Sequence, residues 1–127
     1  MEKLDINSFD MLIKAADYMH DSGFKKENIE YDTARGIFKI TTKEYEYKGR
    51  FIKKQTSAIK GECKLLLFNV QKCDIVERDK LGYQSVGEDY FNTFKIKNEK
   101  TIVIKTTFHE IKIEIEKLEG EFEYCEN

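Results

Sequence analysis

The sequence predicts an α+β domain in which one N-terminal helix packs on a curved, mainly antiparallel sheet of six to eight strands. Helical spacing of apolar residues occurs only near the start of the chain, whereas from residue 28 onward apolar and polar residues alternate. The alternation slips by one residue near Gln71, which is typical of a β-bulge and so indicates curvature. A β-sandwich or half-open barrel with one helix is the alternative arrangement of the same elements.

The helix is predicted over residues 8–20. Leu12, Ala16 and Met19 recur at intervals of three and four, which places them on one helix face. We expect Asn7 to be the N-cap and Gly23 to take the left-handed conformation beyond the C-terminus.

The rest of the chain is predicted to form strands. Residues 28–32 and 36–47 are predicted to form a hairpin with a positive φ at Gly36. Residues 65–68 are apolar on both faces, which predicts a central strand. Further strands are expected over residues 90–97, 101–107 and 111–115, with a last piece near 122 and 124. Loops are expected over residues 48–61 and 79–88, and loops often carry function.

Length and composition predict a single domain over residues 1–127. The formal net charge is -2 with both signs interspersed, which argues against a dedicated nucleic-acid binder. The three cysteines form no metal-binding pattern and favour a reducing, cytoplasmic location. The N-terminus does not resemble an export signal, and the longest apolar run is far shorter than a membrane span. We expect no cofactor, and either a monomer or a homodimer.

A basic stretch is the first candidate site. It holds Lys48, Arg50, Lys53 and Lys54 with tyrosines nearby, and no acid lies between Glu46 and Glu62. Such residues can neutralise phosphates and stack on bases, so a local nucleic-acid site is one alternative. A solvated loop or a charged edge strand is the simpler explanation.

Two histidine–carboxylate pairs are the second candidate. His20 with Asp21 and His109 with Glu110 offer ligand types suited to a divalent metal, so a metal-assisted hydrolase is a further alternative if the pairs meet in space. Helix-end and turn chemistry explains the same residues without a metal.

Surface recognition of a protein is the third candidate. Glu114 and Glu116 are expected on the wet face of a late strand that could dock a basic partner, and Tyr83 could anchor a partner from the second loop. No residue is predicted to be catalytic.

The segment YMHDSGFKKENIEYDTARGIFKI, residues 18–40, resembles the opening of small uncharacterised bacterial families, some of them similar to toxin immunity proteins. The resemblance rests on His20, Asp21, Tyr31, Asp32 and Phe38, and transfers no functional residue. It implies a protein that neutralises a toxin. We therefore expect a non-enzymatic cytoplasmic protein-binding domain of bacterial type, toxin-neutralising or regulatory.

Overall fold

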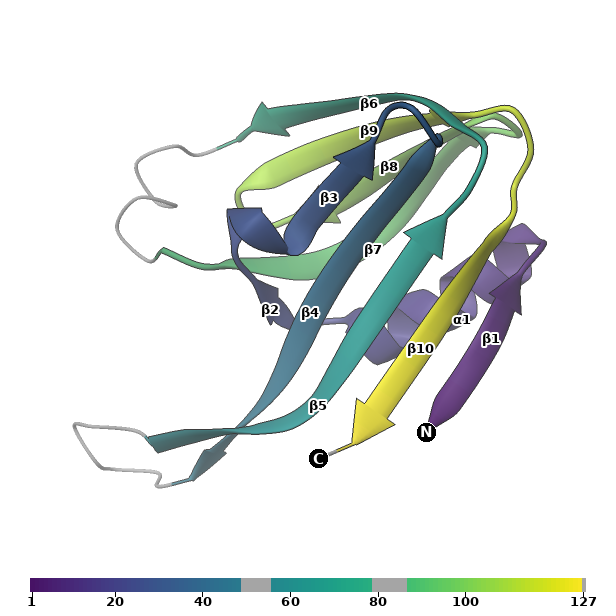
Figure 1. Ribbon diagram of the computed structural model, residues 1–127. Helices are drawn as coiled ribbons and strands as arrows, with labels where there is room; N and C mark the ends of the chain where they lie inside the picture. The colour runs from purple at the N-terminus through teal and green to yellow at the C-terminus, as the bar shows by residue number, and fades with distance from the viewer. Residues whose placement is uncertain (49–55, 79–86, 127) are drawn as a thin grey trace.

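The computed structural model of the chain describes residues 1–48, 56–78 and 87–126, and for residues 46–48 and 56–58 it describes the backbone alone. In this part of the chain one α-helix and ten strands form an α+β fold (Figure 1). The helix is α1 (Phe9–Met19), and the strands are β1 (Glu2–Ile6), β2 (Gly23–Phe24), β3 (Ile29–Asp32), β4 (Ile37–Lys48), β5 (Thr56–Leu67), β6 (Val70–Glu77), β7 (Asp89–Asn98), β8 (Thr101–Thr106), β9 (His109–Ile115) and β10 (Gly120–Glu126). The predicted class is confirmed, but the expected six to eight strands are too few.

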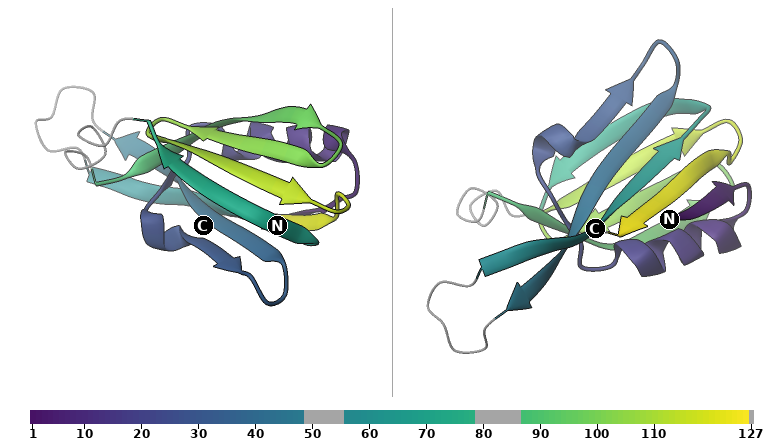
Figure 2. Two further views of the ribbon diagram at one scale, coloured as in Figure 1. Left: turned by 90° about the horizontal axis from the view of Figure 1, so that it is seen from above. Right: turned by 60° about the horizontal axis from the view of Figure 1, so that its bottom comes forward.

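The ten strands belong to one antiparallel sheet that folds back on itself. Its order is β1-β10-β5-β4-β2-β7-β8-β9-β6, with β3 paired to β4 outside this path. The two-residue strand β2 connects the halves, pairing with β4 on one side and with β7 on the other. Figure 2, left, shows the half with β4, β5 and β10 and the half with β7, β8 and β9 as two layers. The arrangement thus shares features with the sandwich-like alternative.

One core lies between the two halves. It combines Phe38 and Leu65 of the first half with Ile104 and Ile111 of the second, all of them fully buried. The helix adds its own apolar face, which includes the buried Leu12. Burial of about 25 cal/mol per Å² of apolar surface makes this shared core the main force that holds the two layers together.

The ends of α1 differ in detail from the prediction. Ser8, not Asn7, is the N-cap, since its Oγ accepts from the backbone N–H of Met11 at 3.4 Å. Asp21 takes the left-handed conformation with φ 62°, whereas Gly23 continues into β2. Aspartate tolerates this region because its short side chain can bond locally, so the chain turns before the glycine.

Two detailed expectations about strands are confirmed. The β3–β4 hairpin forms, and Gly36 in its turn has φ 64°. The β6–β9 register shifts between Val70 and Lys72, which makes Gln71 the extra residue of a bulge at the predicted place.

Two expectations about strand extent are wrong. The short strands β1 and β2 were not anticipated, because few residues are available there to establish a two-residue period. The loop expected over residues 48–61 is strand from Thr56 onward, because polar side chains are tolerated on both faces of a hairpin that leaves the core. Residues 49–55 lie outside the described part.

The β4–β5 hairpin extends beyond the body of the protein (Figure 2, right). The register places Glu44 opposite Gly61 and Tyr45 opposite Ile59, so Lys60 is an extra residue that bends the pair. In the described residues no helix is long and apolar enough to cross a membrane.

Candidate binding surfaces

A buried cluster of polar side chains connects β7, β8 and β9 where their ends meet. Asp89 is fully buried, and one of its oxygens accepts from Thr106 Oγ1 at 2.7 Å and from His109 Nδ1 at 2.5 Å. Its other oxygen accepts from the backbone N–H groups of Tyr90 and Phe108. Because a carboxylate accepts only, Nδ1 of His109 carries the proton.

This cluster is built to hold the strands. The side chain of His109 is only 5% exposed, and its Nε2 lies 3.9 Å from Glu77 Oε1 on β6. The imidazole therefore lies between a carboxylate of β7 and one of β6. A buried polar group costs free energy unless it is paired, so the paired cluster links the β8–β9 turn to β7 and, through Glu77, to β6.

The structure places the two predicted histidine pairs differently. The side chain of His20 is exposed, and its Nε2 lies 3.4 Å from Oδ2 of Asp21. Its Nδ1 donates to the carbonyl oxygen of Asn92 at 2.9 Å. The register of β7 and β8 shifts at Asn92, so this carbonyl belongs to a bulge. His109 instead takes Asp89 as its partner, while Glu110 lies near Lys105 at 3.8 Å.

In the described residues no group of three or more histidine, cysteine, aspartate or glutamate side chains could hold a metal ion. The metal-assisted hydrolase stays an untested prediction.

The basic stretch belongs to the projecting hairpin. Lys48 is the last residue of β4, while Arg50, Lys53 and Lys54 lie outside the described residues. Tyr83, the proposed aromatic anchor, also lies outside them. The nucleic-acid alternative therefore stays a prediction.

The outer face of β9 carries both signs of charge. Glu114 lies 4.0 Å from Lys112 and stands opposite Lys72 of β6 in the register. Glu116 is exposed just beyond the strand, and its backbone N–H donates to the carbonyl of Asn69. The expected acidic face is thus interspersed with lysines.

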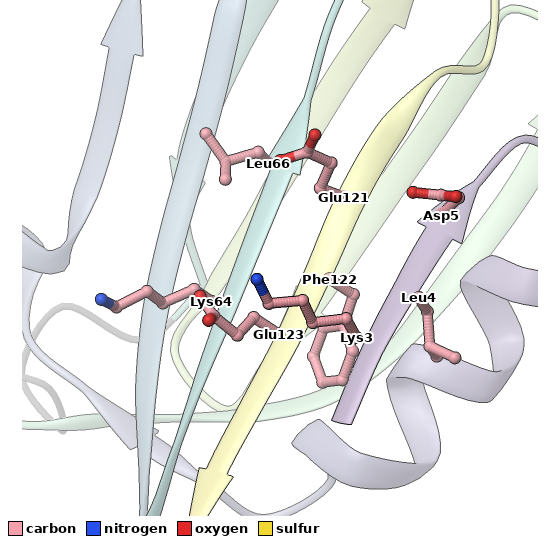
Figure 3. A pocket seen from close by; sticks show the side chains of 8 residues that line it. All are labelled: Lys3, Leu4, Asp5, Lys64, Leu66, Glu121, Phe122 and Glu123. Atoms are coloured by element: carbon pink, nitrogen blue, oxygen red, sulfur yellow. The ribbon is translucent and has the colours of Figure 1, made fainter. Parts of the chain in front are cut away.

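A shallow hollow lies on the outer face of β1, β10 and β5 (Figure 3). Glu123 stands opposite Lys3 of β1 and Lys64 of β5, and Leu66 lies beside Glu121 in the next row. The hollow measures about 170 Å³, which is below the roughly 300 Å³ of typical small-molecule sites.

The three cysteines are free and differ in burial. Burial raises the pKa of Cys63 to about 12 and that of Cys73 to about 11, from an ordinary 9.0. Cys125 is half-buried in β10. The thiols of Cys63 and Cys73 are poor nucleophiles at neutral pH because a raised pKa removes the thiolate.

Strand β6 lies at one edge of the sheet, and no other strand among the described residues pairs with its outer side. The backbone N–H of Arg78 donates to the carbonyl of Phe108, which makes these two a hydrogen-bonded pair. Hydrogen-bonded pairs recur at every second residue of an antiparallel ladder. Val76 and Asp74 therefore point their backbone groups at β9, whereas the N–H and C=O groups of Glu77, Ile75 and Cys73 point away from it, towards the open edge.

Apolar side chains accompany these backbone groups. Ile75, on the inner face of β6, is 43% exposed, and Val76, on the outer face, is 59% exposed. Both are larger exposures than a β-branched residue has inside a sheet. We name Lys72–Arg78 the β6 edge and treat it as the main candidate surface (Figure 1).

Sequence reasoning missed two functional features. Asp89 fell between the loop expected over residues 79–88 and the strand expected over residues 90–97, although its two-residue spacing from Phe91 is a signal that it faces the core. The β6 edge could not be found from sequence, because strand order decides which strand lies at an edge.

Comparison of the chain with protein-family models, with curated proteins and with solved structures found no match. The surfaces described above therefore carry the functional argument.

Proposed function

We propose that the protein is a non-enzymatic binding domain that docks another protein along the β6 edge. The observation that carries this proposal is the combination, in one strand, of outward-facing backbone groups at Cys73, Ile75 and Glu77 with exposed Ile75 and Val76. Sheet edges of this kind take an added strand, because backbone hydrogen bonds supply affinity and the alternating side chains supply specificity.

The polar clusters support a binding role over a catalytic one. Each buried side-chain nitrogen or oxygen in the described residues has a hydrogen-bond partner. The His109–Asp89 pair is one of these satisfied clusters and holds strands together. In this proposal the domain neutralises or regulates its partner in the bacterial cytoplasm, as the immunity-like families that residues 18–40 resemble do.

Affinity isolation from the native host tests the proposal. The probes are the full chain, the Val76→Lys variant and the matched control Ile13→Lys, which places the same charge on an exposed isoleucine of α1. We expect a partner that the full chain and Ile13→Lys retain and that Val76→Lys loses, because a lysine at the edge blocks strand addition. A partner retained equally by all three proteins, or no partner at all, contradicts the proposal.

A further inference from the structure

We propose that a second copy of this chain covers the β6 edge, with the two β6 strands antiparallel and each Val76 facing the Val76 of the other copy. The inference rests on the proposed function in taking the β6 edge as the contact surface. Only one strand can pair with this edge at a time, so the second copy covers it when the other partner is absent and leaves it when that partner binds. The charge pattern of β6 and the position of the exposed apolar residues on this strand support the inference.

Symmetry limits the ways in which two β6 strands can pair. Facing residues of an antiparallel pair lie on the same side of the sheet. A two-fold axis that joins the two sheets into one must therefore lie midway between one residue of β6 and the same residue of the other copy. We call this residue the centre of the pairing. Beyond the bulge the possible centres run from Lys72 to Glu77. An axis at Lys72 or at Glu77 places a charged residue opposite itself, which leaves Cys73, Asp74, Ile75 and Val76.

Charge excludes two of the four centres. An axis at Asp74 brings two carboxylates face to face, since this residue then faces itself. An axis at Ile75 places Lys72 opposite Arg78 of the other copy, twice. Like charges directly opposite each other destabilise a strand pair.

The centre at Cys73 places Lys72 opposite Asp74, which is favourable. It leaves Val76 opposite Val70, however, beyond the bulge at Gln71 where the ladder is interrupted. The most exposed apolar side chain of the strand then stays uncovered.

The centre at Val76 satisfies both conditions. It pairs the two exposed valines at the axis, in a position without backbone hydrogen bonds, where facing side chains approach most closely. It places Asp74 opposite Arg78 on each side of the axis. The outward backbone groups of Ile75 and Glu77 then bond with those of Glu77 and Ile75 of the second copy.

Sedimentation equilibrium of the full chain is the first test. An edge contact buries less than the standard interface of roughly 1,600 Å², so the measurement extends to high protein concentration. We expect a reversible dimer for the wild type and for the Ile13→Lys control, and a monomer for Val76→Lys. A wild type that is monomeric throughout, or a Val76→Lys variant that still dimerises, overturns the inference.

A charge exchange tests the register. Asp74→Arg and Arg78→Asp each place like charges across the axis, so each is expected to raise the dimer dissociation constant about tenfold or more. The double variant restores opposite charges and is expected to recover the dimer. Circular dichroism and thermal unfolding of each variant show whether it is folded, and a folded double variant that stays monomeric overturns the register.

Cross-linking at Cys73 gives an independent readout. In the register centred on Val76, Cys73 and its copy lie about 20 Å apart, at roughly 3.3 Å per residue. Under conditions in which a monofunctional reagent labels Cys73, a short thiol cross-linker is therefore expected to leave this pair unjoined in the dimer. Efficient joining overturns the register in favour of the Cys73 centre. If the full chain is monomeric but a host protein is still captured through Val76, the inference fails and the proposed function stands.

Discussion

At the scale of single residues, Asp89 is the most consequential polar group of the protein. It is fully buried and accepts four hydrogen bonds, one from the next residue and three from β8, β9 and the turn between them. The side chain of Asp89→Asn has one oxygen and an NH₂ group that only donates, so at least one buried donor loses its acceptor. We expect the substitution to lower the free energy of unfolding by about 2–4 kcal/mol.

Urea denaturation followed by circular dichroism measures this effect. The control is Glu30→Gln on strand β3, whose carboxylate lies 3.6 Å from Lys39 Nζ in a surface ion pair. This change is expected to cost less than about 1 kcal/mol. Equal stability losses in the two variants would show that the Asp89 cluster does not hold the strands.

The cysteines give a second residue-scale prediction. Because burial raises the pKa of Cys63 to about 12 and that of Cys73 to about 11, little of either thiol is ionised near neutral pH. We expect a thiol reagent to modify Cys125 first, Cys73 more slowly, and Cys63 only when the chain unfolds. Mass spectrometry of peptides from the labelled native protein measures this order, and rapid labelling of Cys63 in the folded state would contradict the assigned burial.

At the scale of elements, the turn between β3 and β4 lies against the start of β6. Gly36 has φ 64°, its carbonyl accepts from the backbone N–H of Val70, and an added Cβ would lie 2.8 Å from the carbonyl oxygen of Val70. This contact joins the first half of the sheet to the second. A side chain at position 36 would therefore strain both the turn and the contact between the halves.

Gly36→Ala is expected to destabilise the protein by about 2 kcal/mol or more, because the cost of a left-handed alanine, about 1–2 kcal/mol, adds to the close approach. Gly87→Ala is the matched control, since Gly87 has φ 74° but no described atom would lie within 4 Å of its added Cβ. Thermal unfolding compares the two variants. A loss no larger at Gly36 than at Gly87 would mean that the contact with β6 contributes nothing.

The elements also show what sequence can predict. The helix, the β3–β4 hairpin and the bulge at Gln71 were predicted because each has a local signature: a period, a turn glycine or a phase slip. Strands β1 and β2 are too short to show a period, and neighbouring strands define them. The same distinction holds for the candidate surfaces, since the exposure of Val76 depends on β6 being last in the sheet.

At the scale of the whole molecule, ionisable groups buried in the sheet make the free energy of unfolding change with pH in the alkaline range. Burial, and then its hydrogen bond with Glu44, raises the pKa of Tyr124 to about 12, and burial raises the pKa values of Cys63 and Cys73. The unfolded chain releases these protons from about pH 9, while the folded protein retains them. The folded state therefore binds more protons, and its stability falls as the pH rises from about 9 to about 12.

Comparison with Cys63→Ala isolates one of these groups. The variant is expected to lose less stability than the wild type between about pH 8.5 and pH 10.5, since one proton fewer is released on unfolding. Below pH 8.5 the two stability curves are expected to run parallel. Parallel curves at alkaline pH as well would contradict the raised pKa of Cys63.

The central claim is that, within the described part of the chain, the backbone groups of Cys73, Ile75 and Glu77 on β6 have no hydrogen-bond partner. Amide hydrogen exchange, measured by NMR on the monomeric Val76→Lys variant, tests this claim most directly. The account predicts that the amides of Cys73 and Ile75 exchange orders of magnitude faster than that of Asp74, which bonds to β9. Equal protection of all three amides in the monomer would contradict an open edge.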